Sequence, residues 1–200
     1  MTKDDRFKML KGLVRYGHFK RSGQHHQFYI ETEKFFRHAS KESEIAGWLR
    51  GVSESIKKES LTDNPAMTVV FAPEHSSNTE FAHSVNNYIF NGMATVISVR
   101  TASTYRSNFE IEHMAIKKTI ENFHKLYGAS NIYLVFVDDA IQSGETFYRA
   151  NELIRSILPL ELRRNPIVFD WCFVLVDRLS KSSKEALLGK SENFHFFVTA

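Results

Sequence analysis

The sequence predicts an α/β fold with a doubly wound, mainly parallel sheet flanked by helices, and three observations support this prediction. Short apolar runs alternate along the chain with helical patterns, which is the order expected when helices connect parallel strands. The apolar runs are rich in β-branched and aromatic residues, as is typical of strands that are buried on both faces. Polar segments follow the runs, and in this architecture ligands bind at the carboxyl ends of the strands.

The elements follow in order from these patterns. An irregular polar stretch with Gly17 and Gly23 precedes an amphipathic helix at about 42–58, and the clearest boundary lies at 60–65. Beyond this boundary strands and helices alternate. The predicted strands are 67–72, 95–99, 132–137, 167–176 and 194–198, and the predicted helices between them are about 79–91, 110–127 and 146–157.

The composition fits one compact domain. The chain has 200 residues, of which 42% are hydrophobic and 24% charged, and this is enough for a single core. We therefore expect one domain over residues 1–200, with a small N-terminal cap and helix at 1–62 and an α/β core at 63–200.

Charge and targeting signals give broad limits on function. The net charge of +3 is mild and the basic residues are scattered, so nucleic-acid binding has poor support. The single cysteine, Cys172, cannot form an internal disulfide. No stretch approaches the ~18 apolar residues of a membrane span, and the first ten residues lack the apolar core of a signal peptide. We expect a cytoplasmic protein.

The most informative segment joins the third predicted strand to the helix after it. Six apolar residues at 132–137 end in Asp138 and Asp139, and a small polar loop at 142–146 then opens a helical pattern. The free backbone N–H groups of such a turn favour an anion, and Gly144 allows a positive φ and close backbone approach. Carboxylates instead bind hydroxyl groups or a divalent cation. The segment predicts a ligand with a phosphate at one end and a diol in its middle, such as ribose 5-phosphate.

This segment resembles the 5-phosphoribosyl-1-pyrophosphate (PRPP) binding signature of the type I phosphoribosyltransferases. That signature is a hydrophobic strand, two acids, two further residues and a Ser/Thr-Gly-x-Thr loop. The alternative is an acidic strand end followed by a helix-capping turn. Glu145 is irregular, because a carboxylate repels a phosphate unless its side chain points outward at the first helical turn. The resemblance implies the family's fold and a PRPP site at Asp138, Asp139, Ala140, Ile141, Gln142, Ser143, Gly144, Glu145 and Thr146.

A second combination of strand, loop and helix start follows the first predicted strand. In the family that the chain resembles, the equivalent loop holds the pyrophosphate of PRPP through backbone amides, which assigns His75, Ser76 and Ser77 to PRPP. The family's usual glycines are missing here, and larger residues have less backbone freedom. The alternative is that Asn78 or Thr79 only caps the helix.

The end of the fourth predicted strand narrows the resemblance to the orotate phosphoribosyltransferases. This strand ends in Asp177 and Arg178. In orotate enzymes an arginine at this position contacts the carboxylate of the base, which suits the bidentate guanidinium. The resemblance therefore assigns Arg178 to the base, and an ion pair between neighbouring elements is the alternative.

The N-terminal segment supports the same narrower resemblance. Residues 17–30 are similar to the family segment that covers the base. The resemblance places Arg21, or Lys20 in its stead, near the substrate, with Phe28 and Tyr29 as a flat apolar wall for a pyrimidine ring. The alternative is a packed hairpin with solvated basic residues.

The loop after the second predicted strand departs most from the orotate enzymes. In those enzymes a mobile loop rich in lysine carries a His-Gly pair, whereas residues 99–108 contain no lysine, histidine or glycine. Arg100 and Arg106 are the residues that would supply positive charge to the leaving group in catalysis, together with Asp138 and Asp139 at the ribose. A surface loop with two solvated arginines is the alternative.

The sequence gives no signature of a metal site held by the protein alone. None of the nine histidines has a recognised zinc spacing, and one cysteine cannot form a cluster. The family resemblance implies Mg²⁺ that arrives with PRPP near Asp138 and Asp139. The sequence also lacks the phosphate-binding loop of P-loop proteins and the nucleophile elbow of hydrolases.

The sequence therefore predicts a phosphoribosyltransferase that binds PRPP with Mg²⁺, transfers the phosphoribosyl group to orotate or another acidic pyrimidine, and releases pyrophosphate. The alternative is a catalytically inactive module that binds PRPP or a nucleotide and regulates a partner. A role in a nucleic-acid assembly rests only on the mild basicity of the chain. The family resemblance implies a homodimer.

Overall fold

The computed structural model describes residues 13–21, 24–59, 67–99, 106–128, 132–163, 166–188 and 193–199. At 16–21, 24–29, 57–59 and 106–113 the description is of the backbone alone. The predicted boundary between cap and core at 62 and 63 lies outside the described residues.

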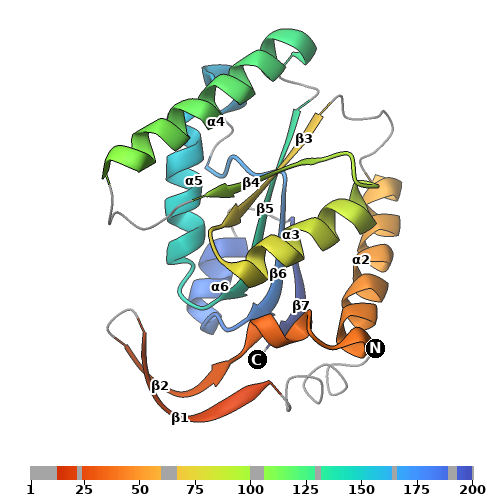
Figure 1. Ribbon diagram of the computed structural model, residues 1–200, viewed down its shortest axis with the longest axis vertical. Helices are drawn as coiled ribbons and strands as arrows, with labels where there is room; N and C mark the ends of the chain where they lie inside the picture. Colours follow the sequence, from red (N-terminus) through yellow and green to blue (C-terminus); the bar gives the residue numbers. More distant parts are fainter. Residues whose placement is uncertain are drawn as a thin grey trace.

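The centre of the molecule is a parallel sheet of five strands (Figure 1). The spatial order is β4-β3-β5-β6-β7, with every neighbouring pair parallel. The chain moves outward from β3 to β4 and then returns to the other side of β3, so the strand order reverses between β3 and β5. The strands are β3 (Met67–Pro73), β4 (Thr95–Val99), β5 (Ile132–Ile141), β6 (Trp171–Asp177) and β7 (Phe194–Thr199).

Helices cover both faces of this sheet, as Figure 1 shows. One core cluster joins buried residues of α2 and α3, among them Leu49 and Phe81, to one face of the sheet. A second cluster joins residues of α4, α5 and α6, among them Ile120 and Ile154, to the other face. The predicted doubly wound α/β fold is confirmed. The helices are α2 (Ala39–Glu59), α3 (Ser76–Ile89), α4 (Arg106–Tyr127), α5 (Glu145–Ile157) and α6 (Lys181–Leu188), with short 3-10 helices η1 (Thr32–Phe35) and η3 (Leu160–Leu162).

The N-terminal segment forms a hairpin, so the prediction of an irregular stretch was wrong. Strands β1 (Val14–Arg21) and β2 (Gln24–Ile30) pair antiparallel, and their register shifts between Tyr16 and Phe19. Gly17 falls inside this irregularity, where a glycine is common in a β-bulge. The backbone N–H of Glu31 donates to the carbonyl of Leu13 at 2.9 Å and closes the open end of the hairpin.

The fourth core strand is shorter than the predicted 167–176, because it begins at Trp171. Residues 167–169 are buried but do not pair with a strand. The N–H of Val168 donates instead to the side-chain oxygen of Asn151 at 2.9 Å. The apolar character of residues 167–169 therefore misled the prediction, because a side-chain amide bonds to this segment where a neighbouring strand was expected.

The remaining differences lie at the ends of elements. β5 continues four residues beyond the predicted end, since Ala140 and Ile141 pair with β6. α3 begins at Ser76 rather than at about 79, and the short polar helix α6 was not predicted. Among the described residues, no helix is long and apolar enough to cross a membrane.

Candidate functional site

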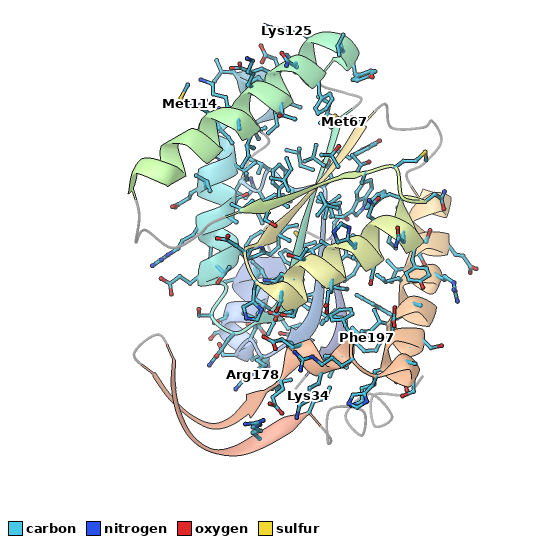
Figure 2. All side chains as sticks on the ribbon, in the orientation of Figure 1. Lys34, Met67, Met114, Lys125, Arg178 and Phe197 are labelled. Carbon is cyan, nitrogen blue, oxygen red and sulfur yellow. The ribbon has the colours of Figure 1, made fainter. Side chains whose placement is uncertain are left out.

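The candidate site lies where the strand order reverses. The segments after β3 and β5 diverge at this point, and the carboxyl end of such a switch is where open α/β sheets bind ligands. The η1 turn reaches the same place, because the Thr32 hydroxyl donates to Asp139 at the end of β5 at 2.5 Å. In Figure 2, Lys34 of η1 and Arg178 lie at this end of the molecule, and Lys125 lies at the opposite end.

Residues 142–146, which we call the cradle, join β5 to α5 and are the segment predicted to bind a phosphate. Gly144 is the N-cap with φ 78 and ψ 0, so the positive φ predicted for this glycine is confirmed. A Cβ atom at Gly144 would lie 3.3 Å from Cε2 of Tyr148, which leaves little room for a side chain. Glycine offers no side-chain capping group, and the N–H of Glu145 has a weak local acceptor, Ser143 Oγ at 3.3 Å. The N–H groups in the first turn of an α-helix have no acceptor within the helix, and they lie at the positive end of the helix dipole, so this end of α5 suits an anion.

Glu145 does not point its charge into this cradle. Its carboxylate pairs with the guanidinium of Arg149 one turn further along the helix, and both side chains are exposed. The first-turn acid is thus partly neutralised by its own helix, as i,i+4 pairs commonly are.

The two acids of the motif differ in environment. Asp138 is buried, and burial followed by the negative charge of Asp139 raises the pKa of its carboxyl group well above 3.8, although a hydrogen bond with Asn78 partly opposes this. The side chain of Asp139 stays 15% exposed. Its Oδ2 atom accepts hydrogen bonds from the hydroxyls of Thr32 and Ser77. Asp139 is therefore the acid that can exchange protein hydroxyls for those of a ribose.

The N-cap and first turn of α3 lie against Asp139. Asn78 accepts the backbone N–H of Asp139 at 2.6 Å, so it joins the first turn of α3 to β5 and does not cap α3, whose N-cap is His75. His75 Nδ1 lies 2.7 Å from Ser77 Oγ. Because the single proton of Ser77 goes to Asp139, the contact requires His75 to donate from Nδ1.

A carboxylate from η1 also contacts this loop. Glu33 Oε1 lies 3.7 Å from His75 Nε2 and accepts the hydroxyl of Ser76 at 3.5 Å. Neither Thr32 nor Glu33 was predicted to belong to the site. No local pattern identifies them, since Thr32 and Asp139 are 107 positions apart in the chain.

The residues predicted to contact the base are placed in part. Arg178 follows β6 at the carboxyl edge, and its backbone N–H donates to the carbonyl of Ile141 at 2.8 Å. The neighbouring Asp177 is fully buried and bonds to Lys184 of α6 and, at 3.4 Å, to Thr199, which anchors the end of β6. The side chains of Arg21, Phe28 and Tyr29 on the hairpin and of Arg106 at the start of α4 lie outside the described residues, as does all of Arg100.

The carboxylates that the structure describes at the carboxyl edge of the sheet are too few to hold a metal ion alone and suit one that binds together with a phosphate ligand. Within the described part of the chain, no group of three or more His, Cys, Asp or Glu side chains could hold a metal ion. Mg²⁺ was predicted near Asp138 and Asp139, of which Asp139 is the more exposed, and Mg²⁺ is commonly bound by one or two carboxylates together with substrate phosphates. The predicted Mg²⁺ stays a prediction on this basis.

A hollow of about 450 Å³ lies at the opposite edge of the sheet, between the ends of α4 and α5. Lys117, Lys125 and Arg163 line it together with Glu121 and Glu161. The carboxyl ends of two helices meet here, and their carbonyl groups disfavour an anion. The hollow lacks the features of a phosphate site.

Solved structures of phosphoribosyltransferases resemble the chain over almost all of its length. The UMP synthase of Leishmania donovani matches 100% of this chain at 17% identity with a TM-score of 0.56. An adenine phosphoribosyltransferase from Thermoanaerobacter pseudethanolicus matches 96% of this chain and 99% of its own length at 12% identity with a TM-score of 0.53. The chain has the fold of the type I phosphoribosyltransferases.

The similarity to phosphoribosyltransferases shows the fold of the chain and does not identify which base it would use. This chain spans 36% of the length of the UMP synthase. An orotate phosphoribosyltransferase from Francisella tularensis matches 100% of this chain and 82% of its own length at 12% identity, and its TM-score of 0.49 is too low to favour orotate. No protein family model and no curated protein sequence matches the chain.

Proposed function

We propose that the chain is a phosphoribosyltransferase that binds PRPP and transfers its phosphoribosyl group to a base, with orotate or another acidic pyrimidine as the acceptor. The observation that carries the proposal is the cradle at residues 142–146 beside Asp139, at the switch point of a phosphoribosyltransferase fold. Catalysis in such a site is mainly the positioning of two ligands and the stabilisation of charge.

Each described group has a defined part in this proposal. The N–H groups at the start of α5 bind the 5-phosphate, and the carboxylate of Asp139 accepts the ribose hydroxyls in place of Thr32 and Ser77. Arg178 at the end of β6 orients an acidic base through its guanidinium. Mg²⁺, when bound with PRPP, would neutralise the negative charge that develops on pyrophosphate. Following the family resemblance, the enzyme would be a homodimer.

The experiment is a screen of bases with PRPP and Mg²⁺ that records both melting temperature and released pyrophosphate. Stabilisation by PRPP together with pyrophosphate release in the presence of orotate is the expected result. A chain that neither gains stability with PRPP nor releases pyrophosphate with any base would refute the proposal.

The matched variants are Gly144→Ala and Gly128→Ala. Both glycines have a positive φ, +78 and +75, and a Cβ atom at Gly128 would meet nothing within 4 Å. Each substitution should cost about 1–2 kcal/mol of backbone strain, but only Gly144→Ala should remove the stabilisation by PRPP. If PRPP stabilised the two variants to the same reduced extent, the cradle would not be the binding site.

The contact of Glu33 with the β3–α3 loop favours a second candidate function. A carboxylate beside His75 and Ser76 is a poor neighbour for pyrophosphate. The second candidate is a catalytically inactive module that binds PRPP or a nucleotide and regulates a partner. It predicts stabilisation by these ligands without turnover, so detectable pyrophosphate release with orotate, uracil or a purine would exclude it.

A further inference from the structure

The two ends of the candidate site differ in the charge that they present. At the start of α5 the acid, Glu145, accepts a hydrogen bond from Arg149 one turn further along the same helix, so its charge is paired within α5. At the start of α3 the acid, Glu33, is directed at the loop itself, through its contacts to His75 and Ser76. An anion at a helix N-terminus is stabilising, and at α3 the protein supplies this anion from its own η1 turn.

The charge of Glu33 is shared between two exposed neighbours. Arg37 Nη2 lies 3.6 Å from Glu33 Oε2, close to the 3.7 Å between His75 Nε2 and Glu33 Oε1, and the Arg37 side chain is 72% exposed. Exposed ion pairs of this kind contribute little, so Arg37 offsets the negative charge of Glu33 only weakly. Asp139 adds a second carboxylate on the same side, 3.8 Å from His75 Nδ1. A ligand group placed against the β3–α3 loop therefore meets a negative surface.

The η1 turn is also held in this position. The hydroxyl of Thr32, which is 4% exposed, donates to Asp139 Oδ2, and Phe35 at the end of η1 is fully buried in the core formed with α2 and α3. Glu33 lies between these two anchors. The backbone at Glu33 is thus held beside the start of α3, within reach of the half-exposed carboxylate.

We propose that Glu33 sets the ligand class of the site, so that the site binds a 5-phosphoribosyl group without an anion at C1 more tightly than it binds PRPP. Ribose 5-phosphate and nucleoside 5′-monophosphates share this chemistry. The inference rests on the proposed function in one respect, that the cradle at the start of α5 binds the 5-phosphate. For a transferase, the same preference makes the nucleotide product a tighter ligand than PRPP.

The test is calorimetric titration of the whole chain with ribose 5-phosphate, UMP and PRPP, each with and without Mg²⁺. We expect the wild type to bind ribose 5-phosphate and UMP at least about tenfold more tightly than PRPP, the size of effect that one nearby unit charge can produce. Glu33→Gln should raise the affinity for PRPP by about tenfold and leave that for ribose 5-phosphate unchanged. Glu33→Asp, which keeps the charge, should retain the wild-type preference.

Glu54→Gln is the matched control, because Glu54 is an exposed acid of α2 and its loss should change no affinity. If the wild type binds ribose 5-phosphate but not PRPP, the result supports the inference. If ribose 5-phosphate binds more weakly than PRPP to both the wild type and Glu33→Gln, the result overturns it. A loss of PRPP affinity in Glu33→Gln with Mg²⁺ would also overturn it, since Glu33 would then hold the ion. Failure of all three ligands to bind the wild type would refute the inference and the proposed function together. If a variant does not fold, the order of the three affinities in the wild type decides the question alone.

Discussion

Asp138 and Asp139 are neighbours in the sequence, but their surroundings give the two carboxyl groups different chemistry. Asp138 is enclosed by the protein and its pKa is raised, first by burial and then by the charge of Asp139. Asp139 is partly open and accepts two hydroxyl hydrogen bonds. At the scale of single residues, the site therefore combines a carboxyl group that favours its neutral form with one that can accept ribose hydroxyls.

Asp138→Asn should stabilise the protein at neutral pH. As pH rises above about 4, the carboxyl group ionises in the unfolded chain, whereas in the folded protein burial and the charge of Asp139 raise its pKa and oppose ionisation. The free energy of unfolding of the wild type therefore falls as pH rises, and asparagine removes this loss. We expect the melting temperature at pH 7 in ligand-free buffer to increase by about 3 °C.

The difference between wild type and Asp138→Asn should disappear as the pH approaches 4. Thermal unfolding followed by circular dichroism between pH 4 and pH 8 measures it. A variant that is less stable than the wild type at pH 7 would show that the ionised carboxylate of Asp138 is favoured in the folded state.

At the scale of elements, the sequence specifies the apolar strands and amphipathic helices and says little about the polar side chains that connect them. The strand at 95–99 was predicted with its correct ends, because this segment is rich in β-branched residues, which favour strands. Residues 167–169 were misassigned, because the amide of Asn151 bonds to Val168 where a strand partner was expected. The ends of β5 depend on pairing with β6, which is a tertiary contact.

Asn86 connects α3 to β4 in a similar way, and its loss should destabilise the fold. Its buried amide donates to the carbonyl of Ala94 at 2.9 Å and accepts the N–H of Ala94 at 2.8 Å. Asn86→Ala leaves both backbone groups without these partners, so we expect a loss of about 2–3 kcal/mol in the free energy of unfolding. Urea denaturation measures this change.

The matched control is Asn87→Ala, because Asn87 is the exposed neighbour in the same helix. Its substitution should change the free energy of unfolding by less than about 0.5 kcal/mol. Similar losses in the two variants would mean that the bonds between Asn86 and Ala94 do not hold the α3–β4 connection.

At the scale of the whole molecule, the sheet brings three distant segments to one edge. The segments after β3 and β5 were predictable, because parallel strands end at the same edge and the strand order reverses between these two. The contribution of η1 was not predictable, because Thr32 and Glu33 reach the site only through the packing of Phe35 against the core. The same packing places Glu33 beside the start of α3, where our proposal requires its charge.

The central claim is that the start of α5 binds the 5-phosphate of a ribose ligand, and a titration with ribose 5-phosphate followed by amide NMR spectra tests it most directly. We predict saturable shifts that are largest for the backbone amides of residues 143–147 and of Asp139. Shifts concentrated at the opposite edge, around Lys117 and Arg163, or no saturable shifts at 143–147, would contradict it.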